Sequence, residues 1–419
     1  MKKIVALLLA LVMVFALAAC GGNSAPAATE APAAESNGAD AEAPAEAPAE
    51  EPAAAAASDL KVGFIFLHDE NSTYDANFMK AAREACTALG LVEGESFLFK
   101  YPIPEGQECY DAAAELVDEG CNVIFADSFG HEDYMIQAAM EFPEVQFCHA
   151  TGTKAHTQGL SNYHNAFASI YEGRFLAGVA AGLKLNEMGE TKIGYVGAFP
   201  YAEVVSGYTS FFLGARSVCP EATMDVTYTY SWYDETLEKE GAEMLIQSGC
   251  KLISQHADSW GAPSACEAAG VPNVSYNGST IDAGPNTYIV ASRINWEPYY
   301  TFVLNAVMNG ETIPADWTGT IATGSVELFE VNEAVAAAGT VEKLAEVKAA
   351  LEAGTLQVFD TATFTVGGAV VDTYLADVDD MGDFVGETEV IADGYFHEST
   401  ERSAPYFDLR IDGITELGV

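Results

Sequence analysis

An internal repeat constrains the fold of this 419-residue chain more than any other feature of its sequence. The segment A-D-S-F-G at 126–130 recurs as A-D-S-W-G at 257–261. The segment that precedes the first copy, L-V-D-E-G-C-N-V-I at 116–124, has a counterpart in L-I-Q-S-G-C-K-L-I at 245–253. Because these matches keep the same order along the chain, we predict two lobes that share one architecture.

Within the first copy, short apolar runs alternate with helical patterns. Residues 61–66, 97–101 and 122–126 are predicted strands, and residues 75–89 and 108–119 are predicted helices that end at a glycine. This alternation predicts a parallel sheet with helices on both faces. The predicted fold class is therefore α/β, with two Rossmann-like lobes, a hinge and a central cleft. Ligands of such sheets bind at the carboxyl ends of the strands.

The N-terminus has the pattern of a secretory signal. Met1-Lys2-Lys3 is basic, and the apolar run 4–19 that follows is too short to span a membrane comfortably. The run ends in L-A-A-C at 17–20, which resembles the lipobox of bacterial lipoproteins, whose cysteine carries lipid. We predict a lipid anchor at Cys20 and an extracytoplasmic, membrane-attached protein; the alternative is an ordinary signal peptide.

The predicted organisation has five parts. After the signal peptide, the Ala-, Pro- and Glu-rich stretch lacks the apolar surface to fold and is predicted to be a disordered linker. The parts are a signal at 1–20, a linker at 21–58, lobe 1 at 59–164 with about 295–325, lobe 2 at 165–294 with about 326–355, and a C-terminal extension packed on the lobes at 356–419.

Charge and cysteine content exclude several classes of partner. With 18 basic and 62 acidic residues, the formal net charge of −44 argues against nucleic acid or anionic lipid as a partner. The seven cysteines that remain besides Cys20 form no C-x-x-C or zinc pattern and are predicted to be mostly buried thiols. We expect no cofactor, no metal and a monomer.

Three further segments resemble the basic membrane protein family of solute-binding lipoproteins. They are E-G-R-F-L-A-G at 172–178, I-G-Y-V-G at 193–197 and T-Y-D at 73–75. The resemblance implies a type I periplasmic binding protein fold, a small planar ligand such as a purine nucleoside or base, and the permease and ATPase subunits of an ABC importer as partners. The chain departs from the family at 276–279, where Y-N-G-S replaces D-x-D, and at Asn295, which replaces a lysine. These departures favour ring stacking over recognition of a full nucleoside.

The candidate ligand residues lie in loops at predicted strand ends. Aromatic rings would stack on a flat ligand, and Asp75 would accept a hydrogen bond from it. The alternatives are a core position for Phe129 and Trp260, a helix cap for each aspartate, and a structural role for His256. The candidates are Tyr74, Asp75, Asp127, Ser128, Phe129, Tyr201, Glu203, His256, Asp258, Trp260, Asn277, Asn295 and Trp296.

Other functions remain as alternatives to a purine receptor. The segment 126–130 resembles a loosened G-x-S-x-G nucleophile elbow, but its duplication in the second lobe argues against a nucleophile, which is needed once. The chain has no H-E-x-x-H, no P-loop and no G-x-G-x-x-G motif. We therefore predict that it is not an enzyme; a surface nucleoside hydrolase is the least favoured alternative. A receptor for a sugar or another polar metabolite, and a surface sensor without transport, also remain open.

Overall fold

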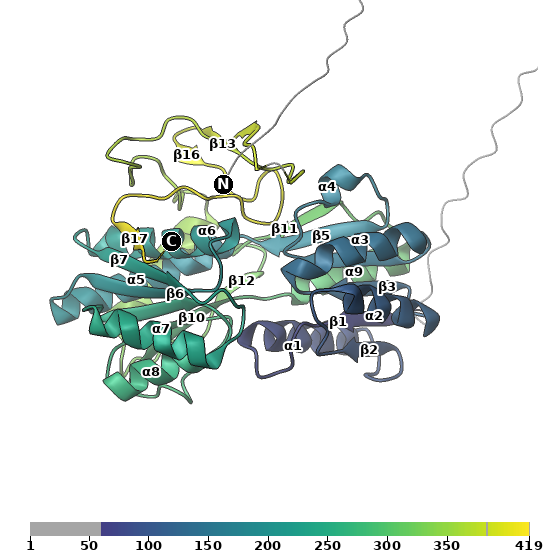
Figure 1. The fold of residues 1–419 in the computed structure, drawn as a ribbon, viewed down its shortest axis with the longest axis horizontal. Coiled ribbons are helices and arrows are strands. Elements are labelled where there is room, and N and C mark those ends of the chain that lie inside the picture. The colour runs from purple at the N-terminus through teal and green to yellow at the C-terminus, as the bar shows by residue number, and fades with distance from the viewer. Residues whose placement is uncertain (1–59, 383, 419) are drawn as a thin grey trace, which may run out of the picture. The chain divides into compact units, whose positions relative to one another are not determined.

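The structure is a computed structural model that describes residues 60–382 and 384–418 (Figure 1). The predicted lipid site Cys20 and the linker 21–58 lie outside the described residues. In the described part of the chain, no helix combines the length and the apolar character that crossing a membrane requires.

Lobe 1 is built on a six-stranded, wholly parallel sheet. Phe64 and Phe125 point to one face of the sheet and pack with α1 and α9, whereas Ile65 and Ile124 point to the other face and pack with α2 and α3. The strand order is β11-β5-β4-β3-β1-β2. The strands are β1 Val62–Ile65, β2 Phe97–Lys100, β3 Val123–Ala126, β4 Gln146–Ala150, β5 Tyr163–Ala168 and β11 Asp316–Gly319; the helices are α1 Thr73–Ala88, α2 Gln107–Asp118, α3 Glu132–Glu141, α4 Ala155–Gln158 and α9 Glu297–Asn309, with a 3-10 turn at Phe129–His131.

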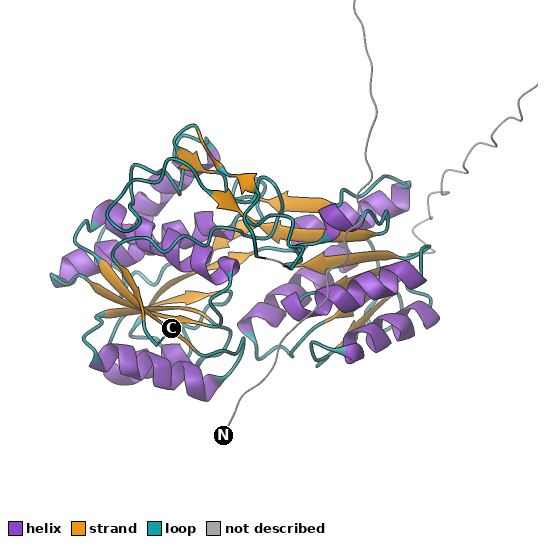
Figure 2. Ribbon diagram, turned by 45° about the horizontal axis from the view of Figure 1, so that its top comes forward, coloured by secondary structure: helices purple, strands orange, loops and turns teal. Residues whose placement is uncertain are grey.

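Lobe 2 repeats this design with a seven-stranded sheet (Figure 2). Its order is β12-β10-β9-β8-β6-β7-β17, and the paired strands are parallel except β12, which runs antiparallel to β10. The strands are β6 Lys192–Gly197, β7 Thr223–Tyr228, β8 Leu252–His256, β9 Asn273–Tyr276, β10 Tyr288–Ile294, β12 Val326–Leu328 and β17 Ile414–Glu416; the helices are α5 Ile170–Met188, α6 Ala202–Val218, α7 Glu235–Gln247, α8 Gly261–Ala269 and α10 Thr340–Glu352. The predicted α/β fold of two Rossmann-like lobes is confirmed.

Three chain crossings join the lobes: one after β5, one between β10 and α9, and one between β11 and β12. The predicted first boundary, at 164, lies inside β5. This strand continues to Ala168 because its backbone pairs with β4 on one side and β11 on the other. The first crossing therefore falls at Ser169, between β5 and α5.

The C-terminal extension is bonded to both lobes. Its last strand, β17, pairs with β7 at the edge of lobe 2, and the backbone N–H of Ser403 donates to Asp316 Oδ1 of lobe 1 at 2.7 Å. Its own core stacks Phe359 on Phe407, with ring centroids 4.2 Å apart. Four short strands precede Ser403 in the extension: β13 Leu375–Ala376, β14 Thr388–Glu389, β15 Ile391–Ala392 and β16 Tyr395–Phe396. The extension therefore forms a strap that reaches from one lobe to the other.

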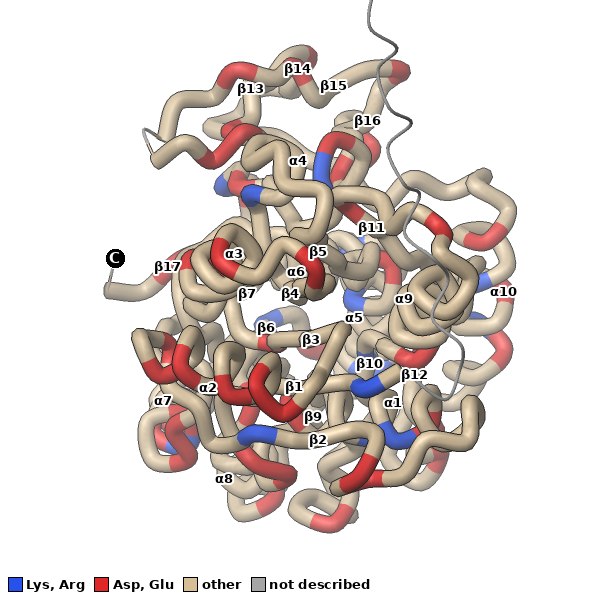
Figure 3. Tube along the Cα trace, turned by 90° about the vertical axis from the view of Figure 1, so that its right-hand side faces the viewer, with Lys and Arg blue, Asp and Glu red and all other residues tan. Residues whose placement is uncertain are grey.

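The seven cysteines among the described residues are buried and unpaired. Burial raises the pKa of the Cys148 thiol to about 12, so this thiol stays protonated and unreactive at neutral pH. Figure 3 shows that acidic positions far outnumber Lys and Arg along the chain.

Candidate ligand-binding site

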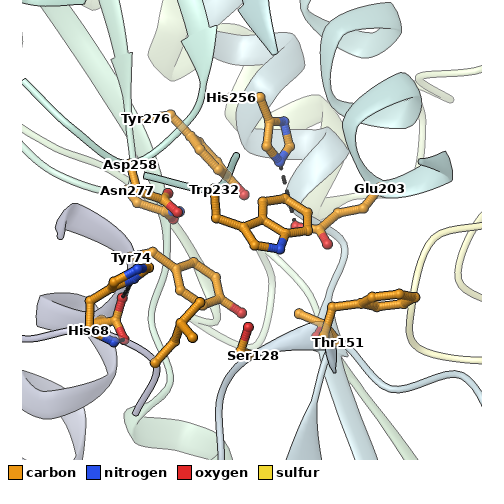
Figure 4. A pocket seen from close by; sticks show the side chains of 13 residues that line it. His68, Tyr74, Ser128, Thr151, Glu203, Trp232, His256, Asp258, Tyr276 and Asn277 are labelled. Carbon is orange, nitrogen blue, oxygen red and sulfur yellow. Dashed lines mark hydrogen bonds and ion pairs between the residues drawn. The ribbon is translucent and has the colours of Figure 1, made fainter. Parts of the chain in front are cut away.

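A cavity with about 370 Å³ of open space lies between the carboxyl ends of the two sheets (Figure 4). Four of its side chains carry phenyl, phenol or indole rings, and two more are imidazoles. The lining residues are Leu67, His68, Tyr74, Asp75, Ser128, Phe129 and Thr151 from lobe 1, and Glu203, Trp232, His256, Asp258, Tyr276 and Asn277 from lobe 2.

Asp75 is a buried anion at the start of α1. Ser72, and not Asp75, is the N-cap of this helix. The Asp75 carboxylate accepts from the backbone N–H of His68 at 2.8 Å and from Ser72 Oγ at 2.6 Å. Burial by itself raises the pKa of Asp75, but these hydrogen bonds outweigh burial and hold the pKa below its usual value. Asp75 thus fixes the loop before α1 and remains charged.

Asp127 supports the cavity from behind and does not line it. Its side chain is buried, and Oδ1 accepts from the backbone N–H of Leu67 at 3.1 Å. Its backbone carbonyl accepts from the Tyr74 hydroxyl at 2.7 Å, which orients the Tyr74 ring. Burial, together with the nearby charge of Asp75, raises the pKa of Asp127 well above its usual value. Burial and the neighbouring Asp75 carboxylate thus both favour the neutral form of Asp127.

The end of β4 places Thr151 in a strained backbone conformation. Its φ angle of 67° lies in the left-handed region, which is unusual for a β-branched residue. The loop is held by the buried carboxylate of Glu132, which accepts from the backbone N–H groups of Thr153 and Lys154 at 2.9 and 3.0 Å. Such strain, stabilised by surrounding contacts, is typical of functional loops.

Lobe 2 contributes His256, which lies between Glu203 and Tyr276 and contacts both. His256 Nε2 lies 3.5 Å from Glu203 Oε1, and burial lowers the pKa of His256 although Glu203 opposes this effect. Tyr276 packs on His256 with ring centroids 4.3 Å apart. The Tyr276 hydroxyl is buried and has no hydrogen-bond partner among the described residues. Because leaving a buried hydroxyl unpaired costs free energy, this group is suited to a ligand partner.

Arg174 of α5 holds the strands that carry these side chains. It is completely buried. One amino group donates to the Ser275 carbonyl and Ser292 Oγ, each at 3.2 Å, and the other to Ser254 Oγ at 2.7 Å. The guanidinium carbon also lies 5.1 Å from the centroid of the Tyr276 ring. Arg174 therefore connects β8, β9 and β10 and fixes Tyr276 from its far side.

The two lobes touch beside the cavity. The Thr73 backbone N–H and hydroxyl both donate to the Asp258 carbonyl, at 3.0 and 3.1 Å. Arg293 Nη1 of lobe 2 donates to Asn77 Oδ1 of lobe 1 at 3.1 Å. A ligand in this cavity would be enclosed by side chains of both lobes, as in hinge closure.

Eight of the thirteen predicted ligand residues line the cavity: Tyr74, Asp75, Ser128, Phe129, Glu203, His256, Asp258 and Asn277. The other five, Asp127, Tyr201, Trp260, Asn295 and Trp296, do not line this cavity. Trp260 is 38% exposed at the N-cap of α8, away from the cavity. Trp296 stacks on Phe78 in the core of lobe 1, with centroids 4.3 Å apart.

Of the other three residues outside the cavity, Asn295 and Asp127 have structural partners, and Tyr201 lines a neighbouring space. The Asn295 amide donates to the Gly324 carbonyl at the crossing between the lobes. Asp127 supports Leu67 and Tyr74, as described above, and Tyr201 faces a second chamber. Neither Asp127 nor Asp258 is the N-cap of the helix that follows it, because Ser128 and Trp260 occupy those positions.

Five further residues line the cavity and were not among the predicted ligand residues: Leu67, His68, Thr151, Trp232 and Tyr276. Trp232 lies in the loop after β7, within the aromatic run Y-S-W-Y at 230–233. Its place after the carboxyl end of a strand could have predicted that it lies near the cavity, because the carboxyl ends of all strands in a parallel sheet share one edge.

The electrostatics of the cavity favour neutral or positively charged ligands. Its lining includes the carboxyl groups of Asp75, Glu203 and Asp258, and no Lys or Arg of the described residues lines it. Burial, followed by the charges of Glu238 and Asp75, raises the pKa of Asp258 well above its usual value. The site thus presents acceptors for N–H and O–H donors and repels phosphate or carboxylate.

The arrangement around Ser128 differs from that of a serine nucleophile. The Ser128 hydroxyl donates to Glu105 Oε1 at 2.6 Å. The adjacent imidazoles contact the Ser128 backbone instead. His149 Nε2 lies 2.7 Å from the Ser128 carbonyl oxygen, and the Ser128 backbone N–H donates to His131 Nδ1 at 3.4 Å. The Ser–His pair that activates a serine nucleophile is therefore not formed by either of these imidazoles.

We expect the stability of the protein to fall as the pH rises through 7, in part because of Glu238. Its buried carboxyl accepts from the Ser259 N–H in the loop of Asp258, and burial raises its pKa to about 7 from an ordinary 4.5. The folded state therefore holds this proton more tightly than the unfolded chain. The stabilisation is complete below pH 4.5 and is lost as the pH rises through 7.

Glu238→Gln should reduce this pH dependence, because the amide is never charged. At pH 8 the variant should be more stable than the wild type by about 1–2 kcal/mol, with little difference at pH 5. Urea unfolding at both pH values measures this, and the exposed Glu235→Gln on the same helix is the control. An equal effect of Glu238→Gln at pH 5 and pH 8 would contradict the assignment.

Two lobes of like topology, with a polar and aromatic cavity at their facing strand ends, define a two-lobe solute-binding protein. Residues 53–355 match the family described as PnrA-like ABC transporter substrate-binding proteins (Bmp), and the chain belongs to this family. Members of the family are extracytoplasmic solute-binding components of ABC transporters, not enzymes, and act with permease and ATPase subunits.

Similar proteins agree with this assignment. A purine-binding protein of Brucella abortus is 35% identical over 260 residues, which cover 61% of this chain and 71% of the relative. A protein of Haloferax volcanii, assigned as an ABC transporter glucose-binding protein, is 36% identical over 209 residues, 50% of this chain and 52% of the relative. An ABC transporter solute-binding protein from Aeropyrum pernix has the same fold, with a TM-score of 0.60 at 16% identity over 72% of this chain and 93% of that one.

Proposed function

We propose that this protein captures a purine base or purine nucleoside in the interlobe cavity and delivers it to an ABC importer. The observation that carries the proposal is the lining of the cavity. Tyr74, Phe129, Trp232 and Tyr276 surround a space next to the carboxyl groups of Asp75, Glu203 and Asp258. The aromatic faces suit a flat ring, and the carboxyl oxygens suit its N–H donors.

The family match and the purine-binding relative support the same ligand class. No Lys or Arg in the described part of the chain lines the cavity, which fits an uncharged ligand better than a nucleotide, whose phosphate would leave its charge unpaired. Contacts from both lobes would let ligand binding stabilise the closed arrangement.

A sugar is the second candidate. The glucose-binding assignment of the Haloferax volcanii relative favours it, and carboxylates beside aromatic rings also suit hydroxyl donors. Calorimetric titration of the purified protein with adenine, adenosine, guanosine, uridine, glucose and leucine separates the two. We expect heat and a raised melting temperature with the purines; binding of glucose alone would replace the purine proposal with the sugar one.

We propose further that lipid on Cys20 attaches the receptor to the outer face of the cell membrane. Two acyl chains would anchor it stably, at about 0.8 kcal/mol for each buried CH₂ group. Cys20→Ala should release the protein from the membrane fraction or leave it unprocessed. Fractionation and mass spectrometry of the N-terminal peptide test this, with the buried Cys148→Ala as the control. A wild-type protein found only in the medium, without lipid, would contradict the anchor.

A further inference from the structure

A second chamber adjoins the ligand cavity. It holds about 950 Å³ of open space, and Phe129, Thr151 and Glu203 line both spaces. Any group on a ligand that passes these three side chains therefore enters the second chamber. The two are called the inner cavity and the outer chamber below.

The C-terminal extension supplies much of the outer wall. Asp380, Arg402, Tyr406, Asp408 and Arg410 line the chamber and belong to the extension. These residues lie beyond 355, where the family match ends. The outer chamber is thus a feature that this chain adds to the shared two-lobe fold.

The polar groups of this wall are held in place. Arg402 is buried and donates to the backbone carbonyls of Val378 and Pro405, at 2.9 and 3.3 Å. Arg410 pairs with Glu416 at 3.0 Å, and Asp380 accepts from the Thr153 hydroxyl of lobe 1. A wall fixed in this way is preorganised, so a ligand would lose little free energy in ordering it.

An aromatic pair forms the boundary between the two spaces. Phe129 of lobe 1 and Tyr201 of lobe 2 have ring centroids 5.5 Å apart, and their side chains are 36% and 43% exposed. Tyr201 lines only the outer chamber. Exposed rings next to the Glu203 carboxylate offer a flat apolar surface and a hydrogen-bond acceptor to a hydroxylated group.

We propose that the outer chamber is a second ligand subsite, which receives an uncharged, hydroxylated substituent, such as a pentose, on the ring held in the inner cavity. This inference rests on the proposed purine receptor function and deepens it. Among the residues that the structure describes, four carboxylates and two guanidinium groups line the chamber. Because both guanidinium groups already have partners, a phosphate on the substituent is disfavoured.

Calorimetry with adenine, adenosine and adenosine 5′-monophosphate tests the subsite in the full protein. Adenosine should bind about tenfold more tightly than adenine and about tenfold more tightly than the monophosphate. Tyr201→Ala should weaken adenosine binding about fivefold and change adenine binding less than about twofold. Tyr201→Phe should preserve most of the affinity. Tyr230→Ala is the matched control, because this tyrosine is 58% exposed and lines neither space.

Equal affinity for adenine and adenosine, or an equal loss of both in Tyr201→Ala, would overturn the subsite while leaving the purine function intact. If no purine binds, the proposed function fails, and glucose with cellobiose becomes the matched pair. In that case the subsite proposal predicts that cellobiose binds more tightly than glucose, and that Tyr201→Ala weakens the binding of cellobiose but not of glucose. Any other result with this pair would overturn it.

Discussion

Replacing Trp232 by alanine is expected to weaken ligand binding by about 2–4 kcal/mol, or about 30- to 700-fold in affinity. The indole lines the inner cavity on the lobe 2 side (Figure 4). Its removal would take away a stacking surface and admit water beside the ligand. The indole also packs on Phe199, with ring centroids 5.1 Å apart. The fold should tolerate the loss of this packing, because the hydrogen bond from the Asp258 N–H to the Trp232 carbonyl, at 3.1 Å, is made by the backbone and is retained.

Trp260→Ala is the control for this prediction. Trp260 is also a partly exposed tryptophan of lobe 2, but it lies outside the cavity. Titration of both variants with the tightest ligand of the panel should show a loss only for Trp232→Ala, at unchanged melting temperature of the free protein. A larger loss of affinity in Trp260→Ala would mean that the ligand binds elsewhere.

The second large effect is expected on stability. Arg174→Ala should lower the free energy of unfolding by about 3–5 kcal/mol. The change removes hydrogen bonds to Ser254, Ser275 and Ser292 and leaves buried acceptors unpaired in three strands of lobe 2. It also opens a void among the rings of Tyr195, Phe211 and Tyr276, which the guanidinium now contacts.

Urea unfolding measures the loss, and Arg216→Ala is the matched control. Arg216 lies on the neighbouring helix α6, is only partly buried and makes one long hydrogen bond, of 3.4 Å, to the Asp412 carbonyl. Its removal should cost less than about 1 kcal/mol. Arg174→Met separates the loss of packing from the loss of hydrogen bonds, because the Met side chain fills much of the same space but donates no hydrogen bond. Stability of Arg174→Ala within 1 kcal/mol of the wild type would show that the network is dispensable.

Much of the site could be predicted because the carboxyl ends of parallel strands share one edge. Tyr74, Asp75, His256 and Asp258 were expected at strand ends, and the structure brings all four to one cavity. The choice between equivalent loop residues could not be predicted in this way. Phe129 and Trp260 occupy matching places in the repeat, yet only Phe129 reaches the cavity.

The sequence by itself determined the two-lobe α/β fold, because strand and helix patterns are local and the repeat made them consistent twice. Only the tertiary structure decided the strand order, the crossing at Ser169, the place of Trp232 in the cavity and the docking of the extension. The pairing of β17 with β7 joins Ile414 to Met224, and no local pattern specifies a contact between residues so far apart. The direction of a loop side chain depends on such long-range packing. The outer chamber, likewise, exists because the extension folds back across both lobes.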